Sequence, residues 1–155
     1  MNTRRFCLIA AIFAAAALPM FAKPNFTGTW TANVSKSDFG QMPAPDKMEM
    51  KVAHEDPKID VHSSQSGQFG EMEWDAKYTT DGNESKNTIR DNPTTSVVKW
   101  DGDVLKFETK GKFGDNDFTM TDKWTLSDDG KTLTMNRHFS SSFGEGDQKV
   151  VLEKQ

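Results

Sequence analysis

The chain has 155 residues, with 19 basic and 23 acidic side chains and a formal net charge of −4. This acidic balance argues against nucleic acids and anionic membrane surfaces as partners. The single cysteine, Cys7, lies in the apolar N-terminal segment. We therefore expect no disulfide, no thiolate nucleophile and no cysteine-based metal site in the folded domain.

Residues 1–22 have the layout of a secretory signal peptide. Arg4 and Arg5 form a short positive region, an apolar run continues to Leu18, and Ala22 ends a cleavage site. The apolar run is too short for a comfortable membrane span. We expect cleavage after Ala22, export to the periplasm or the medium without membrane insertion, and one domain over residues 23–155.

Apolar residues in the rest of the chain alternate with polar ones at a period of two, and no window holds a convincing helical period. In Glu71–Thr79, for example, Met72, Trp74, Ala76 and Tyr78 share one face. Similar alternation predicts strands over Lys47–His54 and Lys58–Ser64. Further strands are predicted around Leu105, Phe107, Phe118, Met120, Trp124, Leu126, Leu133, Met135, Phe139, Val150 and Leu152.

Turn-forming residues separate these runs. Short turns are expected at 56–57, 81–83, 101–103 and 128–131, and longer glycine-rich breaks at 66–70, 111–117 and 144–147. We predict an all-β fold, an antiparallel up-and-down meander of about nine or ten strands closed into a barrel. The alternative is a two-sheet sandwich. The irregular stretch Ser35–Lys47 is expected to cover one end of the barrel, with a helical turn.

Two resemblances support this fold. The segment NFTGTW at residues 25–30 resembles the first strand of lipocalins and fatty-acid-binding proteins, the calycin-type barrels. There, Gly28 would let the strand bend and Trp30 would plug one end. Over nearly the whole mature chain, GTW, SKSDFG at 35–40, two nearby prolines, SDDGKTLTM at 127–135 and the terminal Lys-Gln resemble exported bacterial lipocalin-like proteins. That family has no established activity, so the resemblance implies a lipocalin-like barrel and export.

Arg137 is the main candidate for a ligand contact, because alternation places it on the inward face. Fatty-acid-binding proteins carry an Arg-x-Tyr in a late strand that binds a ligand carboxylate, and residues 137–139 are similar except that Phe139 replaces the tyrosine. Three arrangements remain open. Arg137 binds an anion, or it stacks across Trp30 or pairs with Asp122 on the neighbouring strand, or a bulge turns it outward.

The inward aromatic and methionine side chains either line an apolar pocket or fill the barrel. The candidate ligand-binding residues are Arg137, Trp30, Trp74, Tyr78, Phe107, Met120, Trp124 and Phe139. We expect no metal and no cofactor, because the three histidines share no metal-ligand spacing. His62 and His138 fall on outward faces, and the inward His54 is the one residue that would suit haem.

The sequence contains no catalytic constellation, and Ser140–Ser142 lacks a nucleophile-elbow pattern. It therefore predicts a non-enzymatic exported barrel that binds a small hydrophobic or amphipathic ligand in its interior. The alternative is an envelope protein-interaction module, an inhibitor or accessory subunit, with a filled barrel and no ligand. An internal cavity of several hundred Å³ would favour the first interpretation, at the scale typical of ligand sites.

Overall fold

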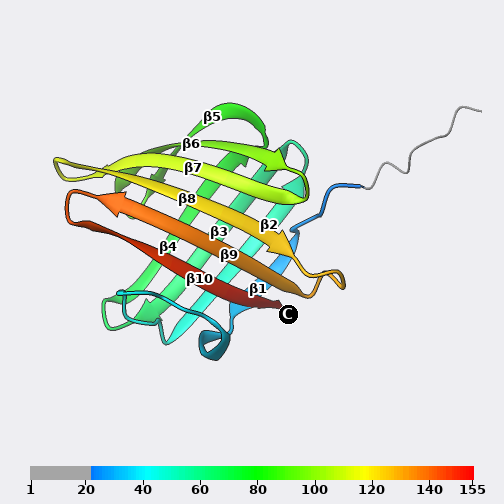
Figure 1. The fold of residues 1–155 in the computed structure, drawn as a ribbon, viewed down its shortest axis with the longest axis horizontal. Helices are drawn as coiled ribbons and strands as arrows, with labels where there is room; N and C mark the ends of the chain where they lie inside the picture. The colour runs from blue at the N-terminus through cyan, green and yellow to red at the C-terminus, as the bar shows by residue number, and fades with distance from the viewer. Residues whose placement is uncertain (1–21) are drawn as a thin grey trace, which may run out of the picture.

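The computed structural model describes residues 22–155, so nearly all of the predicted signal peptide lies outside the described residues. The described chain forms ten β-strands and one short 3₁₀-helix (Figure 1). The elements are β1 (Gly28–Ala32), η1 (Val34–Lys36), β2 (Lys47–Glu55), β3 (Lys58–Gly67), β4 (Gly70–Thr79), β5 (Asp81–Ile89), β6 (Asn92–Asp101), β7 (Val104–Phe113), β8 (Asn116–Leu126), β9 (Thr132–Ser141) and β10 (Gly144–Lys154).

These strands form one antiparallel sheet in the order β4-β3-β2-β1-β10-β9-β8-β7-β6-β5. In Figure 1 the sheet curls over, so that β7 to β10 lie in front of β2, β3 and β4 and cross them obliquely. The pairing of Trp30 in β1 with Lys154 in β10 joins the two ends of the described chain. The predicted barrel is confirmed, and the two-sheet sandwich is wrong.

The barrel has one seam, between β4 and β5, which stand at the two ends of the sheet order. Side chains of β5 bridge it. The amide oxygen of Asn87 accepts a 2.8 Å hydrogen bond from the N–H of Lys77, and its NH₂ group donates to the carbonyl of Lys77 at 3.0 Å. The hydroxyl of Ser85 accepts from the N–H of Thr79 at 3.1 Å. In this way side chains of β5 satisfy main-chain N–H and C=O groups of β4 that have no main-chain partner across the seam.

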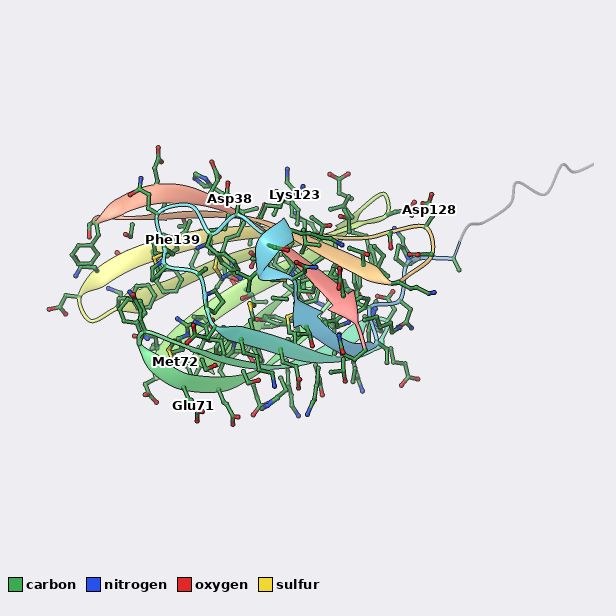
Figure 2. All side chains as sticks on the ribbon, turned by 90° about the horizontal axis from the view of Figure 1, so that it is seen from below. Asp38, Glu71, Met72, Lys123, Asp128 and Phe139 are labelled. Carbon is green, nitrogen blue, oxygen red and sulfur yellow. The ribbon has the colours of Figure 1, made fainter. Side chains whose placement is uncertain are left out.

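The period-two pattern of the sequence is the inside–outside alternation of the barrel wall. Figure 2 shows the neighbouring residues Glu71 and Met72 on opposite sides of β4, with Glu71 projecting outward. The core contains the fully buried Phe26, Trp30, Ile59, Leu105, Leu133 and Leu152. Among residues 22–155, no helix combines the length and the apolar character needed to cross a membrane.

The segment between β1 and β2 contains the expected helical turn, η1, and part of it reaches one end of the barrel, where Phe39, Gln41 and Met42 line the interior. It also runs beside β10, where Asp38 and Lys149 exchange two main-chain hydrogen bonds of 2.7 Å. The physical reason is that β1 has 5 residues and β10 has 11. The segment satisfies part of the edge of β10 that β1 does not reach.

The turns are tighter than the sequence suggested. Strands extend into the glycine-rich breaks at 66–70, 111–117 and 144–147. For example, β7 runs to Phe113 and β10 begins at Gly144. The turn expected at 81–83 lies one residue earlier, at Thr80. Gly82 instead belongs to β5, at a β-bulge between Asp81 and Glu84. The turns at 56–57, 101–103 and 128–131 are confirmed.

Candidate functional site

The barrel encloses a cavity of about 450 Å³. It reaches the end of the barrel that carries the turns at 68–69, 90–91, 114–115 and 142–143, which we call the mouth. The opposite end, which we call the floor, contains Phe26, Trp30, His54 and Trp100. The apolar wall of the cavity includes Met48, Met50, Val61, Trp74, Ala76, Phe107, Phe118, Met120, Trp124, Met135 and Phe139.

The floor is built around Phe26, which is fully buried. Its ring stacks on Trp100 with a centroid distance of 6.0 Å and meets Trp124 edge-on at 5.7 Å. Trp30 is also fully buried, and its indole N–H donates a 2.9 Å hydrogen bond to the carbonyl of Phe26. Trp30 therefore plugs the barrel as the sequence predicts. The cation above its ring is Lys154, 5.3 Å from the centroid, and not Arg137.

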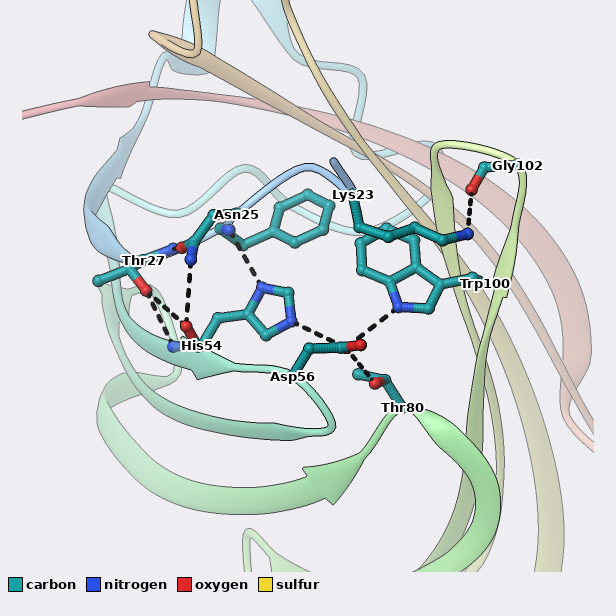
Figure 3. A network of polar contacts seen from close by, with 9 residues as sticks. Lys23, Asn25, Thr27, His54, Asp56, Thr80, Trp100 and Gly102 are labelled. Carbon is teal, nitrogen blue, oxygen red and sulfur yellow. Dashed lines mark hydrogen bonds and ion pairs between the residues drawn. The ribbon is translucent and has the colours of Figure 1, made fainter. Parts of the chain in front are cut away.

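A polar network supports this floor (Figure 3). The imidazole Nδ1 of His54 accepts a 3.3 Å hydrogen bond from the N–H of Phe26, so Nε2 carries the hydrogen that faces Asp56 at 3.4 Å. Asp56 also accepts hydrogen bonds from the hydroxyl of Thr80 and, at 3.2 Å, from the indole N–H of Trp100. The Thr80 hydroxyl is the main cause that holds the pKa of Asp56 below its usual value, with Trp100 and His54 acting in the same direction.

The histidines have partners within the protein. Because both ring nitrogens of His54 face protein groups, its imidazole offers no open position to haem iron. His62 and His138 lie on outer faces, as expected, and contact Asp75 and Asp147 at 2.9 and 2.8 Å. Within residues 22–155, no group of three histidine, cysteine or acidic side chains is arranged to hold a metal ion.

Arg137 points inward and forms a two-point ion pair with Asp122, its register partner on β8. Nε donates to Oδ1 at 2.6 Å and Nη2 donates to Oδ2 at 3.1 Å. Burial is the largest single influence and would lower the pKa of Arg137, but the charge of Asp122 and the hydrogen bonds to it together raise that pKa. Of the three open arrangements, the ion pair is confirmed. Stacking across Trp30 is wrong, because Lys154 lies over that ring. An outward bulge is also wrong, because Arg137 stays in register with Asp122 and pairs with it.

Tyr78 belongs to the same part of the cavity. Burial and the negative charge of Asp122 raise the pKa of its hydroxyl to about 12, against a smaller opposing effect of Arg137. Its ring packs edge-on against Phe107, with centroids 5.2 Å apart. This chain has Phe139 where the Arg-x-Tyr pattern of fatty-acid-binding proteins has a tyrosine. Tyr78, on β4, instead lies close enough to Arg137 for the charge of the arginine to affect its pKa.

Aromatic rings gather on the wall of the cavity nearer the mouth. Phe118 stacks on Phe113 at 4.4 Å and packs against Phe139 at 5.7 Å. Gly111 makes room for this cluster, because a Cβ atom there would lie 2.7 Å from the ring of Phe118. Phe113 itself and three further apolar or aromatic side chains of the mouth contact solvent, namely Met42, Phe69 and Phe143. The mouth is thus more apolar than an ordinary set of turns.

Seven of the eight candidate residues line the cavity, and the exception is Trp30, which is buried in the floor. The sequence did not single out Gln65 or Arg90, which also line it. Gln65 continues the inward phase of Ile59 and Val61, so a longer predicted strand would have included it. Arg90 lies in a turn, where alternation gives no direction for a side chain.

A comparison with solved structures identifies the fold as that of the calycin-type β-barrels. Secretory abundant heat soluble protein 4 of Ramazzottius varieornatus matches with a TM-score of 0.57 and 18% identity, over 86% of this chain and 96% of that protein. Fatty-acid-binding protein 1 of Echinococcus granulosus matches at 0.55 and 15%, over 83% and 96%. Zebrafish ileal bile acid-binding protein, solved with cholic acid, matches at 0.55 and 15%, over 84% and 98%.

At these identities the similarity establishes the fold alone. No protein-family model matches the chain, and no curated protein matches it significantly in sequence.

Proposed function

We propose that this protein binds one small hydrophobic or amphipathic molecule inside its barrel, as a carrier or binding protein without catalytic activity. The cavity of about 450 Å³ is the observation that supports this most directly, because it falls within the range typical of small-molecule sites. The apolar part of its wall is mostly aromatic rings and methionines, which suit flexible apolar ligands. The filled barrel that the protein-interaction alternative requires is not supported.

The structural neighbours agree with this proposal. Their names include a fatty-acid-binding protein and a bile acid-binding protein complexed with cholic acid, both of which bind amphipathic molecules. The polar side chains at the cavity, among them Ser63, Thr109 and the Arg137–Asp122 pair, would suit a ligand that carries polar groups beside an apolar body.

Titration with fluorescent fatty-acid probes tests the proposal. We expect saturable binding with one site per chain, and we expect Ala76→Phe to abolish it because the new ring would enter the cavity from β4. Glu73→Phe adds the same ring to the outer face of the same strand and is the matched control. Failure of the wild-type protein to bind any apolar or amphipathic probe, together with no molecule copurifying from its host, would overturn the proposal.

Export to the periplasm or the medium is part of the proposal, and the layout of residues 1–22 is its support. N-terminal sequencing of the protein from its host should find a chain that begins at or near Lys23. Cytosolic protein that retains Met1 would contradict export while leaving the binding proposal intact.

A further inference from the structure

Arg90 occupies a turn position that usually requires glycine. It and Asp91 have φ values of 51° and 63° in the turn between β5 and β6. The other positive-φ residues of the described chain are all glycines. A left-handed backbone is costly for residues with a Cβ atom, and tight hairpin turns of this kind favour Asn and Gly. The backbone at this position would therefore suit a glycine better than the arginine that occupies it.

Two contacts hold the guanidinium of Arg90 at the mouth of the cavity. It lies over the indole ring of Trp74 in β4, 4.5 Å from the centroid, and Nη2 donates a 3.1 Å hydrogen bond to the side-chain oxygen of Gln65 in β3. All three residues line the cavity. The side chain of Arg90 thus reaches from the β5–β6 turn across the seam to β3 and β4. Stacking on a ring does not consume N–H donors, so the guanidinium keeps further donors for a ligand.

The two cavity arginines differ in their counter-ions. Arg137 is neutralised by the two oxygens of Asp122. No carboxylate within residues 22–155 forms an ion pair with Arg90. Asp147 and Glu145 of β10 also belong to the cavity lining, but the carboxylate of Asp147 contacts His138 on the outer face. Desolvation and, after it, the charge of Arg137 lower the pKa of Arg90, and an anion beside Arg90 would stabilise its positive charge.

We infer that the ligand is an amphipathic anion whose charged group, a carboxylate or sulfonate, binds at Arg90 in the mouth while its apolar body points toward Phe107 and Trp124. This rests on the proposed function and specifies its ligand class. Arg137 is not the anion site, because the carboxylate of Asp122 binds two of its N–H donors, neutralises its charge and would repel a second anion. The charged end of the ligand faces the solvent side of the barrel.

Comparison of a fluorescent fatty acid with its uncharged methyl ester tests this inference. The wild-type protein should bind the acid about 10-fold more tightly than the ester, which is the low end for a charged hydrogen bond. Arg90→Gln should remove this preference, because it weakens binding of the acid far more than binding of the ester. Arg90→Gly should do the same without loss of thermal stability, because the backbone suits glycine. Lys86→Gln, an exposed charge on β5, is the matched control and should keep the preference.

Three outcomes would overturn the inference. Equal wild-type affinities for acid and ester would exclude an anion site while supporting a ligand cavity. A preference that survives both Arg90 variants would place the anion elsewhere, and its loss in the double variant Arg137→Leu, Asp122→Leu would identify the deep pair instead. Binding of neither probe by the wild-type protein would defeat this inference and the proposed function together.

Discussion

Asn87 in β5 binds both main-chain polar groups of Lys77 in β4 through its side-chain amide. One side chain thereby closes part of the seam that the barrel otherwise leaves between its two terminal strands. Hydrogen bonds of this kind contribute about 1 kcal/mol each, and less where water can replace them.

Asn87→Ala should therefore lower the free energy of unfolding by about 1–2 kcal/mol. It should also accelerate hydrogen exchange at the amide of Lys77, whose acceptor is lost. Asn83→Ala is a suitable control, because Asn83 lies on the same strand and, among the described residues, its side chain hydrogen-bonds only to Asp81. Unchanged exchange at Lys77 in the Asn87 variant would mean that the seam is closed by other contacts.

Two tryptophans allow a matched test of the floor. The indole N–H of Trp30 donates to the carbonyl of Phe26, whereas the indole N–H of Trp124 is buried without a partner among the described residues. Tryptophan to phenylalanine removes the same atoms at both sites. Trp30→Phe should cost about 1–2 kcal/mol more than Trp124→Phe, because it leaves a buried carbonyl unpaired while the other change removes an unpaired donor. Urea denaturation measures the difference, and equal losses would contradict the role of the Phe26 bond.

The Arg137–Asp122 pair should show strong coupling. Arg137→Leu leaves the carboxylate of Asp122, whose side chain is only 8% exposed, without its cation. Breaking a buried pair this way costs about 3 kcal/mol, whereas replacing both partners with apolar residues is often nearly neutral. We expect the double variant Arg137→Leu, Asp122→Leu to recover most of the loss of either single variant. Additive losses in a double-mutant cycle would show that the two side chains do not interact.

Tyr78 is the only tyrosine of the chain, so its ionisation can be followed directly by ultraviolet absorbance. The native protein should titrate with a midpoint of about 12. The urea-unfolded chain should titrate near the ordinary value of about 10. Because the unfolded chain loses this proton first, stability should fall as the pH rises from about 10 toward 12. A native midpoint near the unfolded one would mean that the Tyr78 hydroxyl is well solvated.

Asp56 should make the floor sensitive to acid. Its folded-state pKa is lower than that of the unfolded chain, so the ionised carboxylate favours folding above about pH 4 and this contribution is lost as the pH falls through the folded-state value. Asp56→Asn should flatten the loss of thermal stability at acidic pH, since an amide keeps one acceptor for Trp100. Asp103→Asn, in an exposed turn, should leave the wild-type profile unchanged. A profile for Asp56→Asn identical to the wild type would rule out this role.

Alternation was enough to predict the parts of the wall with one apolar face. In β4, Met72, Trp74, Ala76 and Tyr78 face inward as expected. β5 had no such signal, because most of its residues are exposed and polar. β5 belongs to the wall because it pairs with β6, and the alternation within its own sequence does not predict that pairing.

The candidate site was predictable only in part, for the same reason. The inward direction of Arg137 and its partner Asp122 follow from strand phase and register. Arg90 depends on the geometry of a turn, and its contacts with Gln65 and Trp74 join strands that are distant from it in sequence. The position of Trp30 was predictable, but the cation above it comes from Lys154, because the last strand pairs with the first.

That pairing of β1 with β10 also governs when the barrel can close. The other neighbouring strands are consecutive in the chain, so each pair can form as soon as it is synthesised. The contact between Trp30 and Lys154 spans almost the entire described chain, and such distant contacts slow folding because a long loop must be ordered first. The wall is therefore completed only when the last strand is available. Until then the nascent meander stays open along the edge of β1 that β10 later covers.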